Sequence, residues 1–237
     1  MSSTEQKQTA QPVDSEPEVN ILRSVPGFSG LHPEIVKEKD SEGMPWSCGK
    51  FGSHVTLNEA KSMIFVGENT KKIPVPKIFA CYTYGPIYGD ILDFGCLFDT
   101  YIFMSFVEGQ TLDKAWETYD KATKHRVNIQ LKQCICELHE INLSDYIGSV
   151  SFGPVTDPIW ERLPNQGPFT TEEAFSDAPI DAYQLLTPRC HIKHFLAGLL
   201  SQNKYQIVFT HGDLRLANIM VNDEDVTRIA LSKAFAD

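Results

Sequence analysis

Residues 208–221 read Val208-Phe209-Thr210-His211-Gly212-Asp213-Leu214-Arg215-Leu216-Ala217-Asn218-Ile219-Met220-Val221. Apolar runs with the length and residue types of short β-strands flank a polar loop that carries His211, Asp213 and Asn218. Held between strands, the Asp213 carboxylate can accept the proton of an attacking hydroxyl, and Asn218 can hold a metal ion that bridges phosphates. The plainer alternative is a polar hairpin loop in which Asp213 and Asn218 are ordinary turn formers.

The pattern from His211 to Ile219, His-Gly-Asp-Leu-x-x-x-Asn-Ile, resembles the catalytic loop of the aminoglycoside phosphotransferase and choline kinase group, which is related to protein kinases. The resemblance implies an α+β, protein-kinase-like two-lobed fold. It implies an ATP- and Mg²⁺-dependent phosphotransferase that acts on a hydroxyl of a small-molecule substrate. In that activity Asp213 is the catalytic base, Asn218 is a Mg²⁺ ligand, and His211 braces the loop by hydrogen bonds.

A second point of resemblance lies upstream, in the run Lys50-Phe51-Gly52-Ser53-His54-Val55-Thr56-Leu57-Asn58-Glu59-Ala60. In fungal-type members of the family, a strand ending in Lys-aromatic-Gly runs into Val-Thr-Leu-x-Glu-Ala at the start of a helix. The match implies that Lys50 contacts the nucleotide phosphates and that Glu59 pairs with it. A flexible ammonium needs such an anchor if it is to stabilise developing charge.

Both residues also have simpler interpretations. Thr56-x-x-Glu59 is a capping box, which would stabilise the start of a helix and do nothing else. Apart from the resemblance, Lys50 is best interpreted as a solvated surface lysine.

A third segment, residues 101–107, reads Tyr-Ile-Phe-Met-Ser-Phe-Val and predicts a strand that is broken by Glu108-Gly109. By its place between the other two motifs, it resembles the family's hinge between lobes. The resemblance implies that adenine meets the backbone of Ser105, Phe106 and Val107. A buried strand followed by a turn is the alternative.

The motifs divide the chain into three parts. Residues 1–20 have almost no large apolar side chains and predict a disordered tail. Residues 21–104 are expected to form an N-lobe with a small sheet and one helix, and residues 105–237 a hinge and an incomplete helical C-lobe that contains the catalytic loop. Apolar positions with helical spacing predict the N-lobe helix and a long helix in the C-lobe, the latter at Val127, Leu131, Cys134, Ile135 and Leu138.

Composition limits the other possibilities. The net charge of −10 argues against non-specific binding to nucleic acid or to acidic membranes. No apolar run reaches membrane-spanning length, and the polar N-terminus lacks the apolar core of a secretory signal. Scattered cysteines without metal-binding spacing indicate reduced thiols, so we expect a cytoplasmic protein. The sequence leaves the oligomeric state and the acceptor open.

The resemblance weakens toward the C-terminus. The family carries a second metal-binding aspartate on the strand after the catalytic loop, and by spacing it falls near Ala234. The final residue, Asp237, has no following strand, so we expect a C-lobe cut short and weakened Mg²⁺ binding, because carboxylate oxygens suit this ion. Apolar side chains at Val208 and at residues 219–221 are then expected to lack covering helices and to favour aggregation.

Two other functions remain open from the sequence. One is a catalytically inactive, pseudokinase-type module that binds nucleotides or partners, which the missing aspartate favours. The other is a metal hydrolase that uses His211, Asp213 and one of His191 or His194, which nothing else in the sequence supports.

Overall fold

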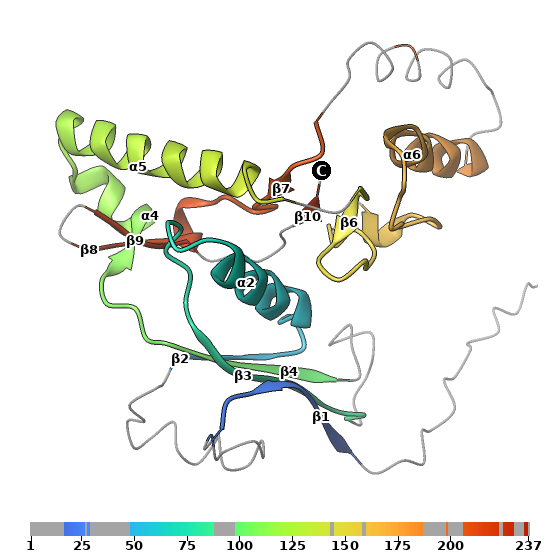
Figure 1. The fold of residues 1–237 in the computed structure, drawn as a ribbon, viewed down its shortest axis with the longest axis horizontal. Coiled ribbons are helices and arrows are strands. Elements are labelled where there is room, and N and C mark those ends of the chain that lie inside the picture. Colours follow the sequence, from blue (N-terminus) through green and yellow to red (C-terminus); the bar gives the residue numbers. More distant parts are fainter. Residues whose placement is uncertain are drawn as a thin grey trace, which may run out of the picture.

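The structure, a computed structural model, describes residues 17–26, 28, 48–87, 98–142, 145–157, 160–186, 198, 206–222, 225–229 and 235–236. Strands and one helix make up the N-terminal part, while helices and two small sheets make up the C-terminal part (Figure 1). The predicted α+β class is confirmed, since every strand pairing is antiparallel.

The N-terminal part is a four-stranded sheet in the order β1-β3-β4-β2. Its strands are β1 (Glu18–Ser24), β2 (Cys48–Gly52), β3 (Ile78–Gly85) and β4 (Asp99–Met104). The first strand begins at Glu18, inside the segment 1–20 for which we expected a tail. β3 and β4 are buried along most of their length, which fits their central positions in the sheet.

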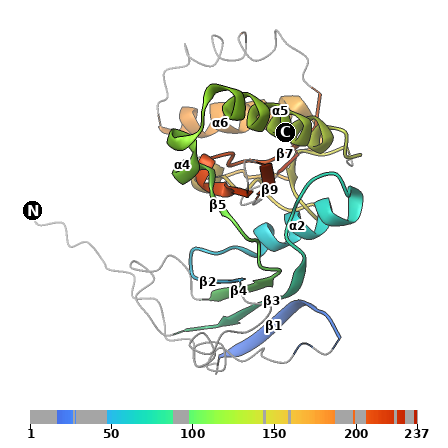
Figure 2. The same ribbon diagram turned by 90° about the vertical axis from the view of Figure 1, so that its left-hand side faces the viewer.

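Helix α2 (Leu57–Asn69) lies between this sheet and the C-terminal part (Figure 2). It buries Ala60, Met63 and Val66, which have the predicted helical spacing. Thr56 stands at the N-cap position in an extended conformation, but its side chain makes no capping hydrogen bond. The helix ends before Pro74, which cannot continue the backbone ladder.

The C-terminal part combines helices with two three-stranded sheets, ordered β5-β8-β9 and β6-β10-β7. Its strands are β5 (Gln110–Thr111), β6 (Gly148–Ser149), β7 (Phe209–Thr210), β8 (Ile219–Asn222), β9 (Asp225–Ile229) and β10 (Phe235–Ala236). Its helices are α4 (Leu112–Ala115), η1 (Trp116–Thr118), α5 (Lys121–His139), η2 (Trp160–Arg162), α6 (Glu172–Leu186) and η3 (Leu216–Asn218).

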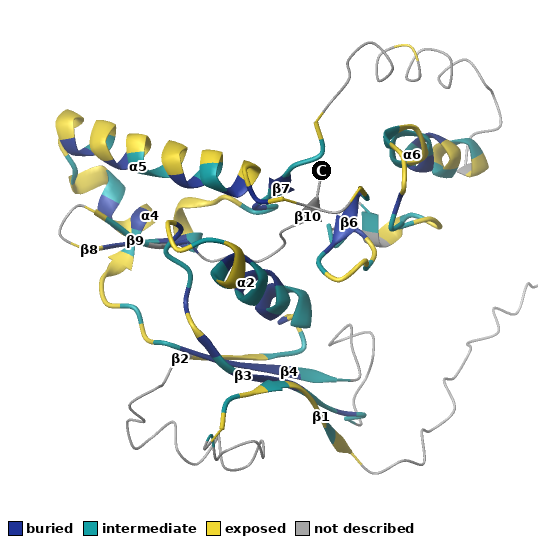
Figure 3. Ribbon diagram, in the orientation of Figure 1, coloured by how far each residue is buried: buried dark blue, intermediate teal, exposed yellow. Residues whose placement is uncertain are grey.

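Helix α5 is the long helix that the sequence predicts. The Asp120 carboxylate caps it by accepting a 2.8 Å hydrogen bond from the Thr123 backbone N–H. The buried positions include Val127, Cys134 and Leu138, and they lie on one side of the helix (Figure 3). No helix in the described part of the chain is long and apolar enough to cross a bilayer.

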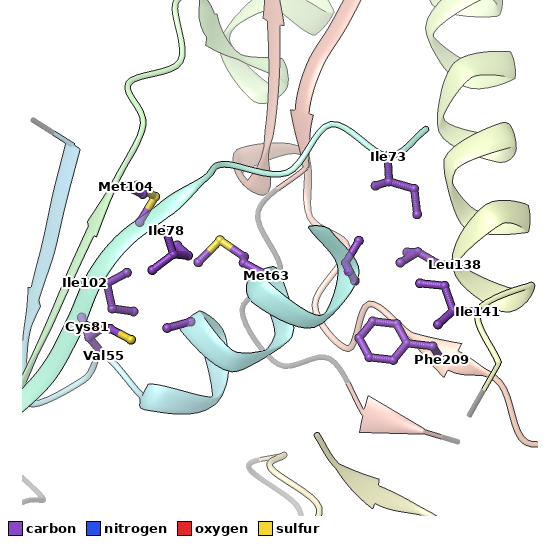
Figure 4. Close-up of a cluster of buried hydrophobic side chains, with 12 residues drawn as sticks. Val55, Met63, Ile73, Ile78, Cys81, Ile102, Met104, Leu138, Ile141 and Phe209 are labelled. Atoms are coloured by element: carbon purple, nitrogen blue, oxygen red, sulfur yellow. The ribbon is translucent and has the colours of Figure 1, made fainter. Parts of the chain in front are cut away.

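The largest buried cluster joins the two parts of the molecule (Figure 4). Met63 of α2 and Ile102 of β4 belong to it, together with Leu138 from the end of α5 and Phe209 of β7. Strand β7, which leads into the loop of residues 211–218, is therefore packed in the same core as the N-terminal sheet.

The linker between α2 and β3 is fastened to the C-terminal part. Lys72 Nζ lies 2.7 Å from Glu137 Oε1 on α5, and the Ile229 backbone N–H of β9 donates to the Pro74 carbonyl at 2.9 Å. The linker is thus held at Lys72 by an ion pair and at Pro74 by a backbone hydrogen bond.

The expectation of uncovered apolar strands is wrong for β8. Ile219 and Val221 are each 1% exposed, because Leu112, Ala115 and Val127 pack against them. Helices α4 and α5, which precede the catalytic loop in the chain, provide the cover that we expected only from later segments. Val208 is partly buried.

Several predicted features lie outside the described residues. These are the helical stripe near residue 195, with Cys190, His191 and His194, and the positions of Ala234 and Asp237.

Candidate functional site

The loop between β7 and β8 has a compact backbone. Gly212 takes a positive φ of 76°, a conformation that glycine adopts without a steric penalty. The Arg215 N–H donates to the Asp213 carbonyl at 2.9 Å, and the Asn218 N–H donates to the Arg215 carbonyl at 2.9 Å. These two bonds fold residues 213–218 into a tight curve that ends at β8.

The structure brings Asp213 and Asn218 together. Asn218 Nδ2 donates to the Asp213 backbone oxygen at 2.8 Å and to Asp213 Oδ2 at 3.1 Å. The Asn218 amide nitrogen donates to Asp213. The other side-chain atom, Oδ1, is an oxygen, which is the kind of ligand that a hard cation such as Mg²⁺ prefers. Asn218 can therefore supply one oxygen ligand to the metal that the sequence predicts at this residue.

His211 is 3% exposed and is the first residue after β7. Its Nδ1 atom accepts a hydrogen bond from the Asp213 backbone N–H at 3.3 Å. A neutral imidazole that accepts at Nδ1 carries its proton on Nε2. This geometry supports the predicted bracing role.

Arg215 is a residue to which the sequence interpretation gave no role. Its Nη2 atom lies 2.8 Å from Asp213 Oδ2, the same oxygen that Asn218 contacts. The signal in the sequence was a cation two residues after the aspartate of the motif. Such a position says nothing about side-chain direction, so the pairing emerged only from the structure.

Lys50 and Glu59 form the predicted pair. Lys50 Nζ lies 2.7 Å from both carboxylate oxygens of Glu59. Glu59 is 4% exposed at its side chain and Lys50 is 46% exposed, so the carboxylate is the buried anchor and the ammonium faces solvent. Since the Glu59 side chain holds Lys50 and Thr56 makes no side-chain cap, the capping-box interpretation does not describe this site.

The hinge segment differs from the predicted strand over residues 101–107. Strand β4 ends at Met104, where the chain leaves the sheet. The Ser105 N–H donates to the Lys77 carbonyl at 2.9 Å, and Ser105 Oγ accepts from the Lys77 N–H at 3.0 Å. An adenine ring that meets this segment would therefore form hydrogen bonds with the Ser105 carbonyl or with the backbone of Phe106 and Val107.

The segment after the predicted hinge is tied directly to β8, the strand after the predicted catalytic loop. Gly109 has a φ of 118°, and a side chain there would collide with the Val221 backbone. The next residue, Gln110, pairs with Val221 in the β5–β8 ladder. The segments that follow residues 105–107 and the β7–β8 loop thus pair in one sheet.

No group of three His, Cys, Asp or Glu side chains in the described residues forms a metal-binding cluster. The hydrolase interpretation therefore has no support within these residues, and its histidines His191 and His194 lie outside them.

Comparison with known proteins decides the family, because residues 56–230 match the model of the phosphotransferase enzyme family. The chain belongs to this family. The match covers well over half of the 237 residues, and it begins six residues after Lys50. The predicted resemblance to aminoglycoside phosphotransferases is confirmed at the family level. The fungal type stays a prediction. A search among curated proteins finds no match.

Solved structures show that this member of the family has the protein-kinase-like fold. They include aminoglycoside phosphotransferase APH(4)-Ia, with 16% identity and a TM-score of 0.51, and the apo form of a thermostable mutant, with 16% identity and a TM-score of 0.50. A further mutant structure is a ternary complex with AMP-PNP and hygromycin B, with 16% identity and a TM-score of 0.51. Each alignment covers 80% of this chain and 60% of the other, so the chain spans about three-fifths of these relatives' length.

Proposed function

We propose that this phosphotransferase moves a phosphoryl group from ATP, bound with Mg²⁺, to a hydroxyl of a small molecule. The observation that carries the proposal is the contact between Asp213 and Asn218 within one loop, 3.1 Å between Oδ2 and Nδ2. A carboxylate for the hydroxyl proton and a carboxamide oxygen for the metal are the two parts that this chemistry takes from the protein loop.

The reaction divides among a few residues. Asp213 accepts the proton as the acceptor O–H bond breaks, while the oxygen forms a bond to the γ-phosphorus and the bond to the ADP oxygen breaks. Asn218 would hold Mg²⁺ through Oδ1, and the ion would offset charge on the phosphate oxygens. Lys50, fixed by Glu59, stabilises the phosphates from the N-terminal sheet. The backbone of residues 105–107 binds the adenine of ATP.

The donor and acceptor classes draw on the neighbouring structures. One similar structure contains AMP-PNP, an ATP analogue, and hygromycin B. We therefore propose ATP as donor and a hydroxylated small molecule, with aminoglycosides as the first class to test, as acceptor. This is a proposal for the activity of the whole protein, since the chain spans only part of those relatives.

The test is ADP release from ATP and Mg²⁺ over a panel of hydroxylated small molecules, with nucleotide binding measured separately by calorimetry. We expect acceptor-dependent ADP release that stops when EDTA removes Mg²⁺. Nucleotide binding without turnover on any acceptor would instead support a nucleotide-binding module. An absence of both would remove the proposal.

A further inference from the structure

Arg215 lies at the centre of the candidate catalytic loop without a part in the proposed reaction. Its guanidinium Nη2 is 2.8 Å from Asp213 Oδ2, and its backbone N–H and carbonyl both take part in the hydrogen bonds that curve the loop. The backbone of Arg215 is therefore fixed. Its guanidinium lies next to the Asp213 carboxylate, which would take the proton from the substrate hydroxyl.

The contact between the two side chains is easily exchanged. The Arg215 side chain is 68% exposed and that of Asp213 is 21% exposed. Ion pairs with such exposure contribute little to stability, because water competes for both partners. Asn218 donates to the same carboxylate oxygen, so Asp213 keeps a hydrogen bond when the guanidinium moves.

A phosphoryl group is the partner for which a guanidinium is best suited. Its planar fork of N–H donors matches phosphate oxygens, and charge on those oxygens is what the site has to stabilise during transfer. The acceptor hydroxyl lies between Asp213 and the phosphorus while it attacks, so a side chain paired with Asp213 is within a rotamer change of the transferred group.

We propose that Arg215 is a catalytic residue. Its guanidinium leaves Asp213 when ATP and the acceptor bind, and it then donates a hydrogen bond to an oxygen of the phosphoryl group during transfer. The inference rests on the proposed function. The acceptor O–H bond breaks and its proton goes to Asp213, the acceptor oxygen bonds to phosphorus, and ADP departs with the electrons of the broken P–O bond. Arg215 exchanges no proton and stabilises the charge on the transferred group.

The test compares the full chain with the variants Arg215→Gln and Arg215→Lys. Arg126→Gln is the matched control, since Arg126 is also a partly exposed arginine, 3.8 Å from Asp225 on a different face. Calorimetry measures the affinity for MgADP alone and for MgADP with aluminium fluoride, which imitates the planar phosphoryl group. Circular dichroism checks the fold of each variant.

We expect Arg215→Gln to bind MgADP like the parent but to bind the aluminium fluoride complex about tenfold or more weakly. Arg215→Lys should recover part of the loss, and Arg126→Gln should match the parent in both measurements. Unchanged affinity for the fluoride complex, or equal weakening with and without fluoride, would overturn the role of Arg215. Failure of the parent to bind MgADP would remove the proposed function and this inference with it.

Discussion

Asp213 offers a substitution that changes chemistry and keeps shape. Asp213→Asn leaves a group of nearly the same size, but the amide cannot take a proton from the acceptor hydroxyl. We expect turnover to fall about 10²–10⁴-fold while the fold is retained. The measurement is acceptor-dependent ADP release. The control is Asp225→Asn, which should turn over like the parent, because Asp225 is an exposed residue of β9 that accepts a hydrogen bond from Gln130 of α5.

The Lys50–Glu59 pair separates activity from stability. Glu59→Gln removes the charge that holds the ammonium, so we expect kcat/KM for ATP to fall about tenfold to a hundredfold, the worth of a charge-assisted hydrogen bond. Stability should change little or rise, because a neutral group replaces a buried charge. Glu68→Gln on the same helix is the control, since its pair with Arg23 is exposed. An equal loss in both variants would contradict the phosphate-site assignment.

Tyr82 provides a stability prediction away from the site. Its side chain is fully buried against Tyr101 and Phe103, and its hydroxyl has no hydrogen-bond partner in the described structure. Burial also raises the pKa of this phenol. Since a buried unpaired hydroxyl is costly, Tyr82→Phe should raise the free energy of unfolding by about 1 kcal/mol. Denaturant unfolding would measure it, and a clear loss of stability would show that the hydroxyl has a partner.

The contrast between Glu59 and Arg215 shows what the sequence can predict at this scale. Glu59 was predictable because a strand lysine and a helix carboxylate at fixed spacing imply a specific contact. The contact of Arg215 was not, since a long side chain with several rotamers can reach solvent, Asp213 or a ligand from the same backbone position.

At the scale of elements, Gly109 connects the hinge to β8. A methyl group there would meet the Val221 backbone, and the positive φ disfavours any other residue. We therefore expect Gly109→Ala to lower the free energy of unfolding by more than about 1 kcal/mol and to shift the β5–β8 pairing. Thermal unfolding would measure the loss. Gly49→Ala is the control, because open space surrounds that glycine and it has an ordinary φ. Equal effects of the two substitutions would contradict this account.

Elements with a strong apolar period were predictable, and those defined by pairing were not. The stripes of α2 and α5 gave both helices, because periodicity alone fixes which face is buried. The strand over residues 101–107 was placed too far along, since its end is set by the bonds between Ser105 and Lys77 rather than by apolar character. β1 and β10 carried no usable local signal and exist through their partners.

At the scale of the whole molecule, the core shared by both parts predicts cooperative unfolding. Leu138 is fully buried in the cluster that also holds Met63 and Phe209. Leu138→Ala should therefore cost about 2–5 kcal/mol. Hydrogen exchange should show the loss of protection in both α2 and α5. Loss confined to α5 would mean that the two parts unfold independently.

The sequence predicted the family fold and the Lys50–Glu59 contact, but it misjudged what covers strand β8. Ile219 and Val221 were expected to face missing helices, yet Leu112 and Val127 already cover them. A motif shows which side chains a loop carries. Which helices bury the neighbouring strand depends instead on how segments far apart in the sequence pack together.

The fastening of the α2–β3 linker has a consequence for the movement of α2. With Lys72 held by Glu137 and Pro74 held by Ile229, the C-terminal end of α2 cannot swing outward without breaking contacts on two elements. Glu59 lies in the first turn of that helix, so a displacement of the helix would also move the carboxylate that binds Lys50. An outward displacement of α2 would therefore have to break the backbone hydrogen bond between Ile229 and Pro74, whereas the exposed Lys72–Glu137 pair would resist it little.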